Sequence, residues 1–209
     1  MNAILLVAIA LVIVLFFTPL PRLVLAALFS RAIGDAALAR TADRIHLEPA
    51  DATTLDNAAP VAAIAREFES AGFVSAGTFR IPELQGMGIQ LLADSANGLY
   101  ASVYDHPVAG VFYEAWSRYD DGGSVTHTTK GPTGIQPREN ARVVNLPGVS
   151  PSVIAEAARR ERRITGQRPA RVENAVRDLE EAYAEYVAWL KGRGISRREV
   201  VEVAARRAA

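Results

Sequence analysis

Residues 3–17 form an uninterrupted apolar run, and no charged residue occurs before Arg22. A helix rises about 1.5 Å per residue, so the uncharged stretch up to Pro21 is long enough to cross a hydrocarbon core of about 30 Å. Only a helix satisfies its backbone amides and carbonyls inside lipid, because a lone strand would leave them unpaired. The sequence therefore predicts a transmembrane helix, with residues 3–21 in contact with the lipid bilayer.

The flanks of this run predict that it is retained, and they predict its orientation. Only Met1 and Asn2 precede it, whereas a cleavable secretory signal normally begins with a basic stretch. Arginines follow it instead, the first at Arg22 and the next at Arg31, so the positive-inside bias places the C-terminal side in the cytoplasm. We expect a single-pass protein of the inner or plasma membrane, with a cytoplasmic soluble domain.

Two prolines limit the first helix. Pro19 and Pro21 end or kink it, because proline lacks an amide proton and restricts the residue before it. Residues 23–29 then either extend the span or lie along the membrane interface. We accordingly assign residues 1–29 to a transmembrane anchor and interfacial segment.

The rest of the chain is predicted to form a linker and one domain. Residues 30–59 lack a sustained apolar period, which is typical of a linker. About 150 residues then remain, a usual size for a single domain. We predict one α+β domain over residues 60–209, with a helical C-terminal part over residues 151–209.

The first part of this domain is predicted to be a helix followed by a sheet. Residues 60–71 place apolar side chains three and four positions apart, which predicts a short helix. From Phe79 onward the period changes to two, as half-buried strands require. Tight-turn signals at residues 97–98 and 121–123 separate the strands. Short loops connect antiparallel neighbours, so we predict an antiparallel meander of four or five strands. A long surface loop over residues 131–137 follows it, and residues 142–146 add a final edge strand.

Two to three helices are predicted after the sheet. Pro151 and Pro169 suit the first turn of a helix, and the pair Ser196 and Glu199 has the spacing of a capping box. The middle helix carries an apolar seam at alternating steps of four and three. Its members are Val172, Val176, Leu179, Tyr183, Tyr186 and Leu190. Such a seam packs on the protein's own sheet or on another chain, so residues 172–190 are a candidate surface for a protein partner or self-association.

Aromatic and polar residues on the predicted strands form the best candidate for a ligand site. Alternation places Tyr100 and Tyr104 on one face of a strand, and Glu114 with Trp116 on one face of its neighbour. If the register aligns these faces, the sheet presents an aromatic platform with fixed polar groups. The alternative is that a C-terminal helix covers the face. The candidates are Tyr100, Tyr104, Glu114, Trp116, Arg118 and His127.

No residue of this set is predicted to be catalytic, and we expect neither a metal nor a cofactor. The three histidines, His46, His106 and His127, have no compact ligand spacing, and His106 before a proline is better explained as a turn residue. The chain has no cysteine, and no serine lies in a Gly-x-Ser-x-Gly motif. Residues 86–88 are only a fragment of a glycine-rich phosphate loop.

Arginines concentrate in the C-terminal part of the chain, at residues 159–163 and 197–207. They could contact anionic lipid, bind nucleic acid, or form solvated helix surface with acidic partners one turn away. We favour solvated surface and do not expect nucleic-acid binding, because a membrane tether restricts access to DNA.

These observations predict a location and an architecture, but no reaction. The leading hypothesis is a membrane-anchored protein whose soluble domain is a binding or interaction module near the membrane surface. The alternative is a membrane-tethered enzyme that uses the polar and aromatic sheet face. A convergent polar pocket containing Glu114 and His127 would favour the enzyme, whereas a filled sheet face would favour the binding module.

Overall fold

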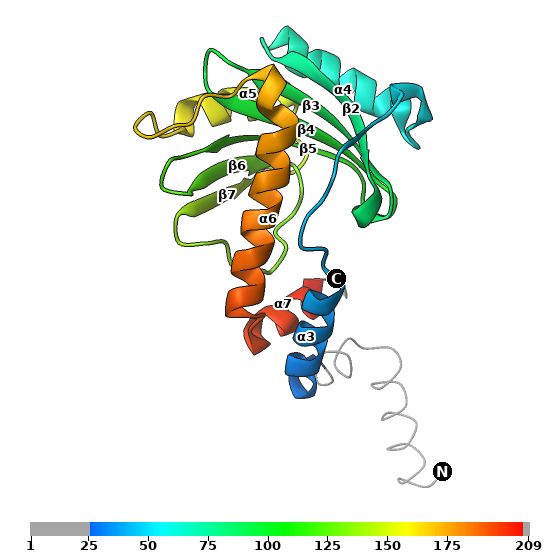
Figure 1. Cartoon of the computed structure of the whole chain (residues 1–209), viewed down its shortest axis with the longest axis vertical. Coiled ribbons are helices and arrows are strands. Elements are labelled where there is room, and N and C mark those ends of the chain that lie inside the picture. Colours follow the sequence, from blue (N-terminus) through cyan, green and yellow to red (C-terminus); the bar gives the residue numbers. More distant parts are fainter. Residues whose placement is uncertain (1–25, 207–209) are drawn as a thin grey trace, which may run out of the picture. The chain divides into compact units, whose positions relative to one another are not determined.

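A computed structural model of the protein describes residues 26–206 (Figure 1). The predicted anchor, residues 3–21, lies outside the described residues. Among residues 26–206, no helix is both long enough and apolar enough to cross a bilayer. The described residues form two compact units, one of residues 42–132 and 137–188, and a smaller one of residues 26–41, 133–136 and 189–206.

The larger unit is built on a seven-stranded sheet in which every strand neighbours the next one in the chain. The strands are β1 (Glu48–Pro49), β2 (Val74–Ile81), β3 (Met87–Asp94), β4 (Leu99–His106), β5 (Gly110–Arg118), β6 (Ser124–Thr128) and β7 (Ala141–Asn145). All pairs are antiparallel except β6 and β7, which are parallel. The α+β class and the antiparallel sheet are thus confirmed.

The prediction of four or five antiparallel strands needs two corrections. It missed β1, which has only two residues and therefore no alternating pattern to detect. It also did not indicate that the last strand, β7, pairs in parallel with β6 across the connection of residues 129–140. A connection of that length can carry the chain back to the start of the neighbouring strand, as a parallel pair requires.

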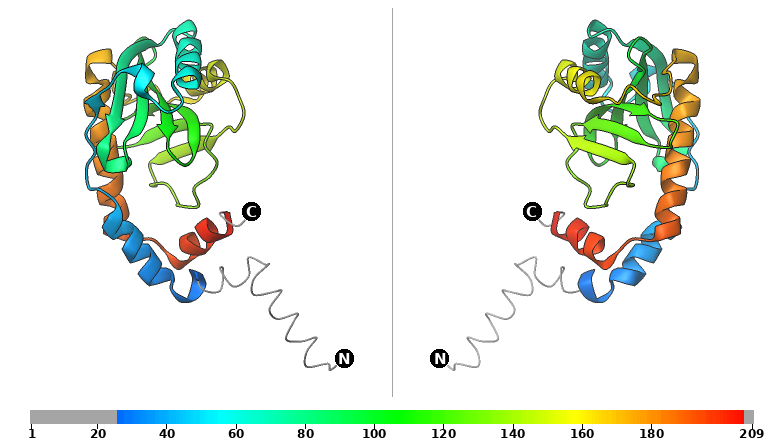
Figure 2. Two further views of the ribbon diagram at one scale, coloured as in Figure 1. Left: turned by 90° about the vertical axis from the view of Figure 1, so that its right-hand side faces the viewer. Right: turned by 90° about the vertical axis from the view of Figure 1, so that its left-hand side faces the viewer.

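Helices cover both faces of the sheet (Figure 2). On one face, α4 (Ala58–Ser70) and α5 (Pro151–Glu161) pack against side chains such as Leu92 and Val103 of β3 and β4. On the other face, the start of α6 (Ala175–Arg193) packs against Ile89 and Leu91. Each face of the sheet therefore has its own apolar cluster. Burial of each large aliphatic side chain in these clusters contributes about 2 kcal/mol to the stability of the fold.

Local sequence signals account for the helix boundaries. Helix α4 follows Asn57, whose backbone amide and side-chain amide both donate to the buried Asp105 carboxylate at 2.9 and 2.7 Å. It ends before Gly72, which has a φ of +95° that glycine adopts without strain. Pro151 lies at the first turn of α5, as its missing amide proton allows. Short 3-10 helices lie at Ala52–Thr54, Pro82–Leu84 and Val172–Asn174.

The smaller unit contains α3 (Ser30–Arg40) and α7 (Arg197–Arg206). They approach closely at Gly34, where an added Cβ would lie 3.8 Å from the Cγ2 of Val200 in α7 and 3.4 Å from the Cβ of Ile195 just before it. The predicted capping box is confirmed, because the Ser196 amide donates to the Glu199 carboxylate at 2.9 Å and the Glu199 amide donates back to the Ser196 hydroxyl at 3.3 Å. Residues 30–59, which were predicted to be a linker, contain helix α3, strand β1 and a 3-10 helix.

Candidate functional site

The register of β4 and β5 brings most of the predicted site residues to one face of the sheet. Tyr100 is opposite Trp116, and Tyr104 is opposite Phe112. Glu114 faces the same way, since it lies two positions from each of its neighbours on that face. The Trp116 indole donates to the Ser102 hydroxyl at 2.9 Å, so adjacent strands are also linked through their side chains.

Helix α6 covers the half of this face that contains Tyr100 and Arg118. The Tyr100 hydroxyl donates to the Asp178 carboxylate at 2.6 Å. The buried Arg118 guanidinium donates to the Asp178 carbonyl at 3.0 Å and to the Glu185 carboxylate at 2.6 Å. Burial, together with the Asp178 carboxylate, raises the pKa of the Tyr100 hydroxyl far above its usual value. These residues fasten the helix to the sheet and are not free to receive a ligand.

The seam predicted on this helix packs mainly on the protein's own sheet. Val172, Val176, Leu179 and Tyr183 contact the apolar cluster formed by Ile89, Leu91 and their neighbours. The seam was predicted to pack either on the protein's own sheet or on another chain, and packing on the sheet accounts for these four positions.

A second part of the face, around Tyr104 and Glu114, is only half-buried. The Tyr104 hydroxyl donates to the Glu114 carboxylate at 2.8 Å, and the Tyr104 ring stacks on Phe112 with centroids 4.7 Å apart. The Lys130 ammonium lies 4.8 Å from the Phe112 centroid. Burial raises the pKa of the Glu114 carboxyl, which lowers its tendency to ionise.

His127 lies on the opposite face of the sheet from the other five candidates. It is opposite Ala115 on β5, whereas Glu114 is opposite Thr128, so the two side chains point away from each other. The His127 side chain is 0% exposed, with its Nε2 3.3 Å from the Glu161 carboxylate of α5. Its Nδ1 is buried without a hydrogen-bond partner, and burial lowers the pKa of the ring.

The remaining histidines have local roles. The His106 ring accepts hydrogen bonds from the Val108 and Ala109 amides at 3.0 Å each, so it shapes the β4–β5 turn as its sequence position suggests. His46 lies 2.6 Å from the Glu83 carboxylate on the surface, and that contact raises the pKa of its ring. In residues 26–206, no group of three or more His, Asp or Glu side chains is arranged to hold a metal ion.

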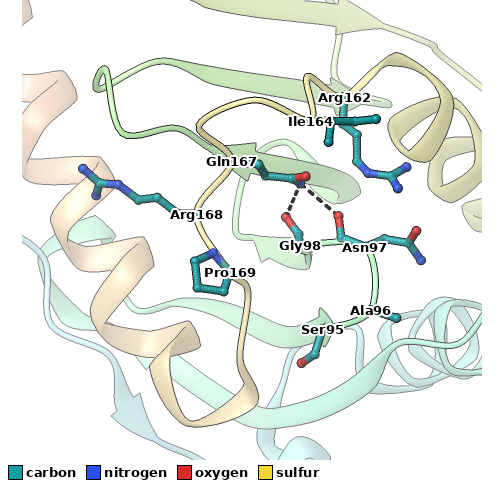
Figure 3. Close-up of a pocket in the computed structure, with 9 residues that line it drawn as sticks. All are labelled: Ser95, Ala96, Asn97, Gly98, Arg162, Ile164, Gln167, Arg168 and Pro169. Carbon is teal, nitrogen blue, oxygen red and sulfur yellow. Dashed lines mark hydrogen bonds between the residues drawn. The ribbon is translucent and has the colours of Figure 1, made fainter.

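A cavity of about 300 Å³ lies between the β3–β4 turn and the loop that follows α5 (Figure 3). Sequence reasoning did not identify it, because its two walls are far apart in the chain and neither contains a motif. The turn at residues 97–98 and the cluster of arginines after residue 159 were its only sequence signals. The lining residues are Ser95, Ala96, Asn97, Gly98, Arg162, Ile164, Gln167, Arg168 and Pro169.

Gln167 joins the two walls of this cavity (Figure 3). Its side-chain amide donates to the carbonyls of Asn97 and Gly98, at 2.9 and 2.8 Å. Gly98 has a φ of +65°, and an added Cβ there would lie 2.7 Å from the Gln167 amide nitrogen. The turn therefore requires glycine both for its backbone conformation and for its close approach to the loop.

The lining of the cavity is positively charged. It contains two arginines and no acidic residue. Arg168 extends away from the turn and lies 3.7 Å from the Asp120 carboxylate. Arg162 donates to the Arg159 carbonyl and forms no ion pair with a carboxylate in residues 26–206. A guanidinium has five N–H donors, so Arg162 retains donors for an anion.

No protein-family model, curated protein or solved structure matches this chain.

Proposed function

We propose that this chain is a membrane-tethered binding module, held to the inner or plasma membrane by residues 3–21. The tether is supported by the apolar run at residues 3–17, which lacks any charge. Leu28, Phe29 and Ile33, which follow it, have exposed fractions of 69, 57 and 44%. Exposed apolar side chains close to an anchor suit contact with the acyl chains at a membrane interface.

A binding role for the larger unit is supported by one observation. Glu114 and His127, the pair that an active site on this sheet would use, lie on opposite faces of it. The face that carries Tyr100 and Trp116 is occupied by the protein's own helix. A catalytic site needs its acid, base and substrate within hydrogen-bond reach, and this arrangement separates the candidates.

The tether is tested by fractionation of cells that express the full chain. We expect the protein to remain with the membranes after an alkaline carbonate wash and to be released by detergent. A variant that lacks residues 2–21 should be found in the soluble fraction. Recovery of the full-length chain in the soluble fraction, or of a chain shortened at its N-terminus, would contradict the proposal.

The orientation is tested by two variants, each with one introduced cysteine. Labelling of either variant reports on that position alone, because the natural chain has no cysteine. Ser152→Cys lies at an exposed position of α5 and Asn2→Cys precedes the apolar run. With the soluble domain in the cytoplasm, a membrane-impermeant thiol reagent should label Asn2→Cys in intact cells and label Ser152→Cys only after lysis. The opposite pattern would reverse the proposed topology.

A tethered enzyme is the second candidate, and the Tyr104–Glu114 pair favours it. A half-buried carboxyl with a raised pKa beside a tyrosine hydroxyl resembles a proton-transfer pair. If the pair is retained for catalysis, Glu114→Gln should raise the melting temperature, because it removes the cost of ionising a buried carboxyl and keeps an acceptor for Tyr104. A lower melting temperature would instead assign Glu114 a structural role.

A further inference from the structure

The cavity between the β3–β4 turn and the loop after α5 lies in the most basic part of the larger unit. Residues 159–171 contain six arginines and a single glutamate. Their present partners decide which of these arginines is available to bind an anion. An arginine that already binds a carboxylate contributes little further attraction to an anion.

Five of the six arginines bind carboxylates of the protein. Arg159 binds Asp94 at 2.7 Å, and Arg163 binds Asp121 at 3.0 Å. Three have longer contacts, namely Arg160 with Glu161, Arg168 with Asp120 and Arg171 with Glu173, at 3.5, 3.7 and 3.8 Å. Arg162 is the exception within residues 26–206, and it lines the cavity.

The other groups of the cavity suit a phosphate group that carries an organic part. The Ser95 hydroxyl lines the turn side and has no hydrogen-bond partner in the described chain, so it is available to donate. A phosphate presents acceptor oxygens in several directions and can bond to a guanidinium through two of them. Ile164, 82% exposed, adds an apolar wall that a bare inorganic ion would not contact.

We propose that this cavity binds a phosphate monoester, with Arg162 as the anion-binding residue and Ile164 in contact with the organic part. The inference rests on the proposed binding role, whose ligand class it names, and it is independent of the tether. The ligand comes from one of two sources with the same chemistry, a soluble phosphate ester or a phosphate-bearing lipid headgroup.

The test uses the purified full chain in a neutral maltoside detergent and isothermal titration calorimetry at constant ionic strength. The probes are inorganic phosphate, phenyl phosphate and dihexanoyl phosphatidic acid, with phenol as the uncharged control. We expect saturable binding of both esters, weaker binding of inorganic phosphate and none of phenol. Tighter binding of the phosphatidic acid than of phenyl phosphate assigns the lipid source, and the reverse order assigns the soluble one.

Two matched variants identify the site. Arg162→Gln should weaken phenyl phosphate binding at least about tenfold, because a charge-assisted hydrogen bond is lost. Arg160→Gln removes the same charge two residues away, from a side chain that is 71% exposed and outside the cavity lining, and should change the affinity less than about twofold. Ile164→Ser should weaken the binding of phenyl phosphate and leave the affinity for inorganic phosphate unchanged.

Two results would overturn the inference: no saturable binding of any phosphate probe, or equal losses of affinity in Arg162→Gln and Arg160→Gln. Either result would leave the tether intact if the chain still fractionates with membranes, so failure of the site and failure of the tether are distinguishable.

Discussion

The Tyr100 hydroxyl donates a hydrogen bond of 2.6 Å to the Asp178 carboxylate, which joins strand β4 to helix α6 in the interior of the larger unit. The Arg171 amide donates to the same hydroxyl at 3.1 Å, so Tyr100 also fixes the segment that leads into the helix. The Tyr100 ring also packs against Trp116, with centroids 4.6 Å apart and the ring planes tilted by 35°. A residue predicted to bind a ligand thus holds the helix that covers its own face.

Tyr100→Phe is expected to destabilise the protein by about 1 to 2 kcal/mol, because the buried Asp178 carboxylate loses a hydrogen-bond donor. Tyr183→Phe is the matched control. Its ring contacts the same apolar cluster, but its hydroxyl has no hydrogen-bond partner in residues 26–206. Urea denaturation followed by circular dichroism measures the free energy of unfolding of both variants. Equal stability of the two variants would show that the bond to Asp178 contributes nothing.

Arg159→Ala is expected to lower the free energy of unfolding by about 3 kcal/mol. The Arg159 guanidinium binds the Asp94 carboxylate through two nitrogens, at 2.9 and 2.7 Å, and Asp94 is 3% exposed. Removal of Arg159, whose side chain is 29% exposed, leaves the charge of the buried Asp94 carboxylate without its guanidinium partner, which is the costly case. Arg160→Ala, from an exposed side chain, should change the stability by less than about 0.5 kcal/mol. Similar midpoints of guanidinium denaturation for the two variants would contradict the expectation.

His127 is expected to make the stability fall on acidification. Burial lowers the pKa of its ring below the ordinary value of 6.5, so between these two pKa values the unfolded chain binds more protons than the folded one. The contribution is therefore fully present above about pH 6.5 and is lost as the pH falls toward the folded-state pKa. The charged groups that act on the ring are Glu161, which raises its pKa, and Arg142 and Arg160, which lower it.

Denaturation at several pH values between 5 and 8 measures this dependence. His127→Gln should flatten the profile over that range. His46→Gln should make it steeper, because the contact with Glu83 raises the pKa of His46 and its contribution has the opposite sign. An unchanged profile in His127→Gln would assign the pH dependence to other groups.

Glu199 is expected to control the stability of α7 in the smaller unit. Its carboxylate binds the Arg193 guanidinium at 2.5 Å and accepts from the Gln136 amide at 2.8 Å, and these contacts lower its pKa to about 2. The stabilisation is present above the usual carboxyl pKa near 4.5 and is lost as the pH falls toward 2. Glu199→Gln should accelerate amide exchange in α7 about tenfold or more, whereas Glu202→Gln, which removes only the half-exposed pair with Arg206, should change it less than about twofold. Equal exchange rates in the two variants would contradict this role.

Helices α4 to α7 and most strands were predictable because their signals are local, whereas α3 lies in the segment predicted to be a linker. Pro151, the capping box that begins at Ser196 and the turn at Asn97 each act within a few residues of themselves. Their effects do not depend on what packs nearby, so the sequence alone is sufficient to place them.

The candidate site was less predictable because it depends on register and on distant partners. Alternation indicates which residues of one strand share a face, but only the pairing of β5 with β6 places His127 behind the sheet and Glu114 in front of it. Similarly, no sequence pattern relates Asn97 to Gln167, whose contact forms the cavity. Pairings of this kind are properties of the assembled fold.

The strand order has a consequence for synthesis. Each strand from β2 to β7 pairs with the strand made immediately before it, so on emerging from the ribosome it meets a partner already present. Helix α6 is the last helix of the larger unit to be made, and until it arrives the nascent sheet presents Tyr100 and Trp116 to solvent. Between translation of β7 and of α6, this face of the sheet is therefore open to aggregation and to chaperones.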